Sequence, residues 1–367
     1  MLGRHQKAEK RAKGLSNFTP KKQVNLRKAD GSICSTPEEN ASTFLSHFQQ
    51  LYQRAPTCDD SVIDLLPDSV CHVNADLPPT DAEIKAAIQK LNNTAPGVSG
   101  ILSTLWKSLA TNDDSFELIR LVVLEFYETE TPPMEWNIGL LAILPKKGDL
   151  KDTNNYRGIM LLETCYKIVA NILHARLLPI AEQIDNETQC GFRPERSCAD
   201  AIFTVKLAMK KRKEHNMETW ILFLDFVKAF DRVPRHLLWH VLKKFGVPPK
   251  LIRLLTSLHD SVHVNFETSG ITKSFRNSIG VKQGDTLGPL LFTFYIAAIF
   301  NSWRETTTTS PCIFKTSQDF QLTGRNHKNQ GELFLIRDSE YADDAAAIFC
   351  NRSDLSDAAK ELISHCR

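Results

Sequence analysis

The hydrophobic positions of this chain follow two different patterns, and the pattern changes near residue 135. Before that point, apolar side chains return every three or four residues in two segments, which predicts two amphipathic helices. Thr36 precedes the first segment and Thr80 the second, and each is followed by proline or carboxylates typical of a first helical turn. Between the two helices, residues 55–78 are rich in proline, aspartate and serine, which predicts a linker.

From residue 135 onward, short apolar runs alternate with helical patterns, which favours a mixed α+β fold. Buried strands are predicted over 139–145 and 220–226, short strands over 333–336 and 345–349, and a hairpin over 262–268 and 273–279. Helices are predicted over 164–184, 197–215, 236–245, 249–258, 285–303 and 354–365. Pro179 is expected to kink or end the first of these helices. The polar, threonine-rich residues 304–330 predict a surface insertion.

Composition places the chain among folded proteins. Its length of 367 residues predicts about two domains or one large one. Its residues are 42% apolar and 24% charged, which excludes a disordered chain, a collagen-like fibre or a small disulfide scaffold. The longest apolar stretch, residues 287–300, contains Gly288 and Pro289 and is shorter than the roughly 18 residues that a membrane span needs. We therefore expect a core helix there and no membrane partner.

Charge is nearly balanced overall, with 45 basic and 43 acidic residues, but its distribution is uneven. Residues 1–28 contain nine Lys or Arg and one acid, which predicts a basic arm that contacts phosphates, acts in nuclear targeting or is a solvated tail. The nine cysteines include no Cys-x-x-Cys pair, so no zinc site is expected. Reduced thiols and the lack of a signal segment predict an intracellular protein, cytoplasmic, nuclear or both.

Three aspartates are the strongest candidates for chemistry. Asp225 ends the apolar strand at 220–226, while Asp343 and Asp344 form a tight turn before the strand at 345–349. An Asp-Asp turn alone is more typical of a structural role. Carboxylates brought together from separate strands, however, suit Mg²⁺, which prefers oxygen ligands and substrate phosphates. Two such ions could activate an attacking hydroxyl and stabilise a leaving pyrophosphate.

A glycine-containing loop, Gly280-Val281-Lys282-Gln283-Gly284-Asp285, precedes the predicted core helix. Its two glycines allow the backbone to approach a ligand closely, and Gln283 offers both a donor and an acceptor. The start of the following helix could face a phosphate or a base pair. Taken alone, the loop is more typical of a plain strand-to-helix turn.

Seven short motifs follow one another along the chain. They are Ala95-Pro96-Gly97 through Gly100, Leu144-Pro145-Lys146-Lys147-Gly148-Asp149, Asn155-Tyr156-Arg157-Gly158-Ile159, Gly191-Phe192-Arg193, Leu224-Asp225-Phe226 with Lys228-Ala229-Phe230-Asp231, the glycine loop, and Tyr341-Ala342-Asp343-Asp344. Each motif is weakly specific, whereas seven in order are highly specific. From about residue 95 to the C-terminus, the chain resembles the reverse transcriptases of non-LTR (LINE-type) retrotransposons.

The resemblance implies an α+β right-hand polymerase fold with an antiparallel palm sheet and helical fingers. It divides the chain into 1–78, a basic arm and helical linker preceding the polymerase, and 79–367, the reverse transcriptase fingers and palm. Because 23 residues follow Asp344 in a chain of 367, the thumb is expected to be missing and the chain truncated. The implied reaction is RNA-templated addition of dNTPs to the 3'-OH of a DNA primer.

The resemblance also assigns a metal site. Asp225 and Asp343 would hold two Mg²⁺ ions, for which Mn²⁺ is a substitute, with Asp344 close by. The backbone carbonyl of Phe226 would be a further ligand. Phe230 is at the position where the family has an aromatic that blocks a ribose 2'-OH.

Four further residues would contact the nucleotide. Gln283 and Gly284 would line the nucleotide sugar and the template base pair. Arg157 and Lys146 would bind the incoming triphosphate as cations of the fingers.

Two departures from the family pattern stand out. Val98-Ser99 replaces a usual Pro-Asp pair, and Asp285 adds a negative charge near the expected nucleic-acid path. Two alternative functions also stay open at this stage. One is a catalytically inactive truncated relic or a domesticated RNA-binding protein, and the other is a group II intron-type polymerase-maturase.

Overall fold

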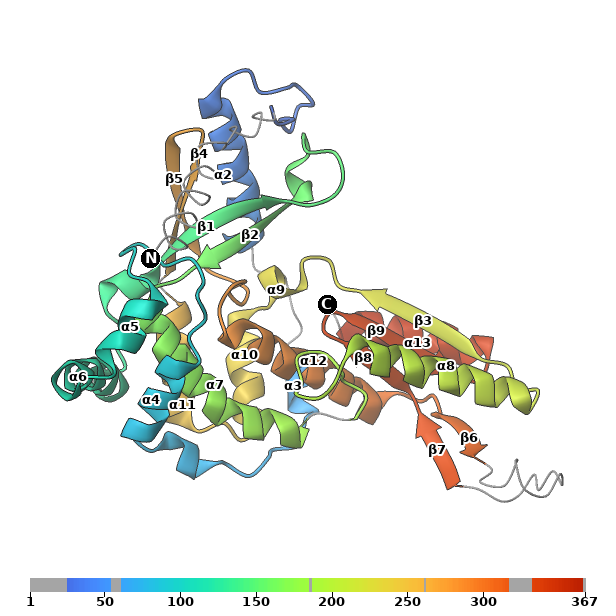
Figure 1. Cartoon of the computed structure of the whole chain (residues 1–367). Helices are drawn as coiled ribbons and strands as arrows, with labels where there is room; N and C mark the ends of the chain where they lie inside the picture. Colours follow the sequence, from blue (N-terminus) through green and yellow to red (C-terminus); the bar gives the residue numbers. More distant parts are fainter. Residues whose placement is uncertain (1–24, 54–60, 185–186, 261, 317–331, 366–367) are drawn as a thin grey trace, which may run out of the picture.

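Helices and β-sheets alternate along the described chain, as the computed structural model in Figure 1 shows. The structure describes residues 25–53, 61–184, 187–260, 262–316 and 332–365. Within these residues, a four-stranded sheet has the order β2-β1-β4-β5, a three-stranded sheet has the order β3-β9-β8, and β6 pairs with β7. The mixed α+β class predicted from the sequence is therefore confirmed.

The four-stranded sheet joins two antiparallel pairs through a parallel contact between β1 and β4. Its strands are β1 (Ile138–Pro145), β2 (Tyr156–Leu161), β4 (Val262–Thr268) and β5 (Ile271–Asn277). The predicted strand at 139–145 and the hairpin are confirmed, whereas the sequence pattern does not predict β2. Burial of β1 is only partial, because its last two residues, Leu144 and Pro145, are exposed.

Helix α2 (Pro37–Gln53) packs against this sheet, mainly on β5. The predicted helix start is confirmed, because the Thr36 hydroxyl accepts a hydrogen bond of 3.2 Å from the backbone N–H of Glu39. The buried face of α2 is aromatic. Phe48 and Tyr52 stack on Phe275 of β5, with ring centroids 6.2 and 5.7 Å apart. Through these rings, α2 belongs to the larger of the two hydrophobic clusters of the described chain.

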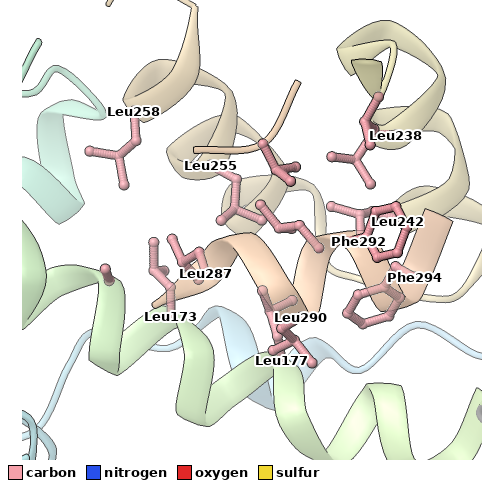
Figure 2. Packing of buried hydrophobic residues seen from close by; sticks show 14 of the residues in the cluster. Leu173, Leu177, Leu238, Leu242, Leu255, Leu258, Leu287, Leu290, Phe292 and Phe294 are labelled. Carbon is pink, nitrogen blue, oxygen red and sulfur yellow. The ribbon is translucent and has the colours of Figure 1, made fainter. Parts of the chain in front are cut away.

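A layer of helices surrounds α12 (Leu287–Thr306), and the prediction of a core helix there is confirmed. Figure 2 shows side chains of α7 (Thr164–Ile184), α10 (Arg235–Lys244) and α11 (Pro249–His259) meeting α12. The labelled residues, each at most 4% exposed, are Leu173, Leu177, Leu238, Leu242, Leu255, Leu258, Leu287, Leu290, Phe292 and Phe294. Burial of each such side chain contributes roughly 1.5–3 kcal/mol. α7 continues through Pro179, so Pro179 does not end the helix.

Further elements connect these parts. They are α3 (Ser61–Asp64), η1 (Val73–Asp76), α4 (Asp81–Gln89), α5 (Ser103–Leu109), α6 (Asp113–Thr129), η2 (Met134–Asn137), η3 (Thr153–Asn155), α8 (Cys198–Glu214), α9 (Ala229–Arg232), β6 (Cys312–Thr316), β7 (Glu332–Ile336) and α13 (Arg352–His365). Thr80 caps α4 through a capping box with Glu83, as predicted. The sequence pattern does not predict α5 or α6.

The three-stranded sheet consists of β3 (Trp220–Asp225), β9 (Asp344–Phe349) and β8 (Asp338–Tyr341). The strands predicted at 220–226 and 345–349 are confirmed. The prediction that the first of them is buried is wrong, because β3 is an edge strand and Phe223 is 73% exposed. The sequence pattern does not predict β8, whose polar residues have low β propensity.

Several predictions fall partly outside the described residues. Residues 1–24 of the basic arm and 54–60 of the linker are not described, whereas 61–64 and 73–76 of the linker are helical. In the predicted insertion at 304–330, α12 extends to residue 306 and β6 pairs with β7, while 317–330 lies outside. None of the described helices is long and apolar enough to cross a bilayer. The domain boundary at residue 78 stays a prediction.

A buried arginine joins the helical layer to the glycine loop. Arg235 begins α10, is 5% exposed, and donates five hydrogen bonds of 2.5–3.1 Å. The acceptors are the carbonyls of Gly280, His259, Asn277 and Ile279 and the side-chain oxygen of Asn277. Burial lowers the pKa of Arg235 to about 10, so the side chain is still charged at neutral pH. One cation therefore ties α11 and the end of β5 to the glycine loop.

Replacing Arg235 with Met tests this role. We expect the free energy of unfolding to fall by about 3–5 kcal/mol, because several buried carbonyls lose their donor. Urea denaturation measures the difference. The matched control is Arg232→Met on the exposed side of α9, which should change stability by about 0.5 kcal/mol or less. Equal losses in the two variants would contradict the role of Arg235.

Candidate active site

Strand pairing brings two of the predicted aspartates together. In the antiparallel register of β3 and β9, Asp225 lies directly opposite Asp344, and Asp343 lies in the turn between β8 and β9. Asp225 and Asp344 are exposed, and Asp343 is half-buried. The pKa of Asp344 is raised, first by partial burial and then by the negative charges of Asp343 and Asp225. The three carboxylates therefore form one cluster of mutually repelling charges.

This cluster has the donor chemistry of a magnesium site. Carboxylate oxygens are ligands that Mg²⁺ prefers, and the carbonyl of Phe226, directly after β3, could add another. Within the described residues, no three His, Cys, Asp or Glu side chains converge closely enough to hold a metal ion by themselves. Mg²⁺ commonly takes one or two carboxylates and completes its shell with water and substrate phosphates. The residues present fit that incomplete type of site.

A buried glutamine holds the turn that carries Asp343. The side-chain carbonyl of Gln189 accepts hydrogen bonds from the backbone N–H groups of Gly191 at 2.6 Å and Ala342 at 3.2 Å. Ala342 has φ of 57°, a left-handed conformation that is unfavourable for alanine. A Cβ atom at Gly191 would lie 2.1 Å from the Ala342 nitrogen, which explains the glycine of the Gly191-Phe192-Arg193 motif. This motif thus supports the aspartate turn from outside the sheet.

Two buried acids of β8 also brace this hairpin. Asp338 and Glu340 of β8 are 0% and 2% exposed, and both bind the guanidinium of Arg304 at the end of α12. Arg304 also donates to the hydroxyl of Thr188 at 3.0 Å. Because each buried carboxylate has a cationic partner, the polar sequence of β8 is compatible with a buried strand. The sequence analysis did not identify Gln189 or Arg304 as supporting residues. The one signal in the sequence was the run of polar residues before Gly191 and in β8, which need hydrogen-bonding or ionic partners if they are buried.

The glycine loop packs against β2 and not against the cluster of Asp225, Asp343 and Asp344. The backbone N–H of Met160 donates to the carbonyl of Gln283 at 2.7 Å. Gly284 has φ of +105°, and a Cβ atom there would lie 2.5 Å from the Met160 carbonyl oxygen. Only glycine fits this close approach, which is to the backbone of β2, whereas the sequence predicted a close approach to a ligand. The side chain of Gln283 donates to Asp231 at 2.9 Å.

Asp285 does not add charge to the surface. It is 4% exposed and accepts hydrogen bonds from the Tyr166 hydroxyl and from the backbone N–H of Leu287. Burial raises the pKa of Asp285 and lowers the pKa of the neighbouring Lys282 to about 7. The Lys282 ammonium donates to the carbonyl of Leu258 at 2.7 Å. The expectation of a negative charge on the nucleic-acid path is therefore wrong, because Asp285 belongs to the core beneath the loop.

The predicted cations lie on the β1–β2 ribbon. Lys146 directly follows β1, and Arg157 lies on β2 opposite Leu144. Both side chains are exposed, and no described residue forms a hydrogen bond or ion pair with the Arg157 guanidinium. Since β2 also bonds the glycine loop at Met160, Arg157 and Gln283 lie on connected elements. No direct contact joins either cation to the three aspartates within the described residues.

Phe230 is part of an aromatic cluster with Phe192 and Phe292. Its ring stacks on Phe292 of α12 with a centroid separation of 4.5 Å and meets Phe192 edge-on at 5.8 Å. The ring is half-buried. It therefore links the α9 segment both to the core helix and to the motif that supports the aspartate turn.

Two grooves lie near these elements. A largely apolar groove of about 540 Å³ runs between α8 and the three-stranded sheet, and its lining includes Phe223, Asp225 and Asp344. A larger groove of about 780 Å³ lies between α2, η3 and α9, and Lys228 and Arg232 line it. The smaller groove is the one that reaches the candidate metal ligands.

The mutual repulsion of the aspartates predicts how the pKa of Asp344 changes when a neighbouring charge is removed. Replacing Asp225 with Asn removes a nearby negative charge, so the pKa of Asp344 should fall, and Asp343→Asn should lower it further. Carboxylate ¹³C NMR titration measures the change. The control variant is Asp357→Asn on the exposed side of α13, which should leave the titration of Asp344 unchanged. An unchanged pKa in both test variants would show that the three carboxylates do not interact.

Comparison with known proteins places these residues in a family. The family described as "Reverse transcriptase (RNA-dependent DNA polymerase)" matches residues 144–367, which include all three aspartates. The Xenopus laevis "Transposon TX1 uncharacterized 149 kDa protein" is 26% identical over 354 residues, 92% of this chain and 25% of that protein. The Drosophila melanogaster "Probable RNA-directed DNA polymerase from transposon X-element" is 27% identical over 288 residues, 75% of this chain and 31% of that protein.

A third relative, the "RNA-directed DNA polymerase from mobile element jockey" of Drosophila funebris, is 24% identical over 290 residues. That match covers 75% of this chain and 31% of the relative. The chain thus spans 25–31% of the length of these three relatives. The resemblance to non-LTR retrotransposon proteins is confirmed, and the chain belongs to the reverse transcriptase (RNA-dependent DNA polymerase) family.

Proposed function

We propose that this chain is the polymerase part of a retroelement protein, adding dNTPs to the 3'-OH of a DNA primer on an RNA template. The observation that carries the proposal is the β3–β9 register, which sets Asp225 opposite Asp344 with Asp343 in the adjoining turn. Phosphoryl transfer requires positioning and charge neutralisation rather than a protein nucleophile. A carboxylate cluster beside a groove, in a member of this family, suits that chemistry.

The aspartates would act by holding divalent cations. Asp225, Asp343 and Asp344, with the carbonyl of Phe226, would bind two Mg²⁺ ions, and Mn²⁺ could replace them. Bound ions of this kind activate the attacking hydroxyl and neutralise charge on the leaving pyrophosphate. Gln189 and Arg304 would keep the ligands in place, since they fix the hairpin that carries two of the three carboxylates.

Other residues would bind the nucleotide. Arg157 and Lys146, exposed on the β1–β2 ribbon, would attract the triphosphate. Gln283 and Gly284 would contact the nucleotide sugar and the template base pair. Phe230, fixed between Phe192 and Phe292, would present a rigid edge that excludes a ribose 2'-OH.

In this proposal the fold corresponds to the fingers and palm of a right-hand polymerase. The three-stranded antiparallel sheet would be the palm, and the β1–β2 ribbon with the surrounding helices would be the fingers. Residues 1–78 would precede the polymerase and 79–367 would form it. Free thiols at all described cysteines fit an intracellular protein, cytoplasmic or nuclear.

Primer extension tests the proposal. The full chain, a primed homopolymer RNA, labelled dNTP and Mg²⁺ should give incorporation that EDTA abolishes and Mn²⁺ partly restores. Asp225→Ala and Asp343→Ala should each lower the rate by on the order of 10²–10³ or more, because transition-state charge loses its counter-ions. The exposed Asp357→Asn variant should retain full activity.

The outcomes separate the proposal from its alternatives. Incorporation that survives both alanine substitutions would overturn the assignment of the aspartates. A folded chain that binds RNA but incorporates nothing would favour the inactive RNA-binding alternative. Tight and specific binding of an intron RNA would favour a polymerase-maturase.

A further inference from the structure

We propose that Asp231, supported by Tyr52 of α2, is a positioning residue that orients the amide of Gln283 toward an incoming nucleotide. This inference rests on the proposed function, because it takes Gln283 as a nucleotide contact. It adds two residues to the site and makes α2 part of nucleotide recognition. Residue 52 lies outside the stretch 144–367 that matches the family.

The first observation is that Gln283 is fixed at both ends. Its backbone carbonyl accepts from Met160 of β2 at 2.7 Å, and its side-chain Nε2 donates to Oδ1 of Asp231 at 2.9 Å. A glutamine amide has two N–H donors and one carbonyl acceptor. The carboxylate of Asp231 can only accept, so it must face the nitrogen end of the amide. The second N–H and the carbonyl oxygen of half-buried Gln283 are then left for a ligand.

The second observation is that Asp231 is buried without a salt bridge to a described residue. It is 6% exposed, its carboxylate accepts a hydrogen bond of 2.9 Å from Gln283, and the Tyr52 hydroxyl and the charges of Lys228 and Lys146 favour its ionised form. Its backbone N–H donates to the carbonyl of Lys228 at 3.0 Å. A buried carboxylate with a neutral hydrogen-bond donor would be an unfavourable choice if it only filled space.

The third observation concerns Tyr52, which is itself held on three sides. Its backbone carbonyl accepts from the N–H groups of Ser278 at 2.9 Å and Ile279 at 3.2 Å, directly before the glycine loop. Its ring stacks on Phe275 of β5. A Cβ atom at Gly158 of β2 would lie 3.2 Å from the Tyr52 hydroxyl oxygen. The hydroxyl therefore meets Asp231 from a rigid position, and α2 contacts the loop through both backbone and side chain.

The charge of Asp231 decides which way the amide of Gln283 can lie. An ionised carboxylate can only accept, so it accepts from Gln283 and attracts the Tyr52 hydroxyl, whereas a protonated one carries a donor and loses part of this capacity. Burial raises the pKa of Asp231 to about 6, an effect that Tyr52, Lys228, Gln283 and Lys146 oppose. The orienting form therefore predominates above pH 6 and is lost as the pH falls through that value. An asparagine at 231 can face the amide with either end, so it would permit both orientations at every pH.

Nucleotide binding by the full chain tests the inference without relying on turnover. A fluorescent dNTP analogue in the presence of Mg²⁺ gives Kd for the wild type, Asp231→Asn, Tyr52→Phe and the control Asp357→Asn. At pH 7.5 we expect Kd to rise about five- to tenfold in Asp231→Asn and about two- to fivefold in Tyr52→Phe. The control should match the wild type. Asp231→Asn removes a buried charge without changing shape, so it should fold normally, which thermal unfolding checks.

The pH profile distinguishes positioning from a general structural effect. Between pH 7.5 and 5, the ratio of Kd in Asp231→Asn to Kd in the wild type should fall toward one, because the wild-type carboxyl becomes neutral. Titration of the triphosphate and of Lys282 affects both proteins and cancels in this ratio. In steady-state primer extension, Asp231→Asn should raise KM for dNTP and leave kcat within about twofold.

Each outcome has one interpretation. A ratio near one at pH 7.5, or a raised ratio that does not change with pH, would overturn the role of Asp231. If either of these results is obtained while Asp225→Ala still abolishes incorporation, the proposed polymerase function stands and only this inference fails. Binding that depends on Asp231 in a chain without incorporation would support the inference and contradict the polymerase proposal. A folded wild type that binds no dNTP would overturn both.

Discussion

The buried guanidinium of Arg235 is the interaction on which the arrangement of the site most depends. It donates to carbonyls from the end of α11, the end of β5 and the glycine loop, segments that would otherwise bury unpaired oxygens where they meet. Unpaired backbone carbonyls in a core are strongly unfavourable, and a planar group with five N–H donors can satisfy several at once. The loop conformation that places Gln283 beside β2 follows from this convergence.

The carboxylates of the β8–β9 hairpin lie in two different environments. In the buried part, Asp338 and Glu340 share the guanidinium of Arg304, which offsets part of their negative charge and orders the strand. At the exposed end, Asp225, Asp343 and Asp344 have no cationic partner among the described residues. The pKa of Asp344 is raised by burial and by the charges of Asp343 and Asp225. A stable site can tolerate this repulsion only because the hairpin is braced elsewhere. The buried part of this strand pair therefore holds the hairpin in place, while its exposed end presents the carboxylates.

The sequence predicts the local elements and the chemistry of the site better than it predicts their surroundings. Helix starts such as Thr36 and Thr80 and the apolar period of α12 are local signals, and the structure contains all three features. Burial of β3 was predicted wrongly, because whether a strand lies at a sheet edge depends on partners far along the chain. Periodicity cannot specify such partners.

The same limit explains the errors at the site. Asp285 looks like a surface charge until Tyr166, 119 residues earlier, is found to donate to it. The acids of β8 look like a loop until Arg304 is placed beside them. Pairing of Asp225 with Asp344 could be inferred from the resemblance, but the bracing of their hairpin by Gln189 could not. Residues that act by reaching the backbone or side chains of another element leave no spacing pattern of their own.

The position of α2 bears on how the catalytic part of such a chain should be defined. The match to the family model starts at residue 144, yet Tyr52 acts on Asp231, whose carboxylate accepts a hydrogen bond from Gln283. Phe48 and Tyr52 also supply part of the aromatic core beneath β5, so α2 contributes both stability and contact with the loop. A fragment that began at residue 144 would expose Phe275 and leave Asp231 with one neutral donor fewer. A physically complete site therefore requires α2, which lies before the stretch matched by the family model, even though α2 contains none of the proposed metal ligands.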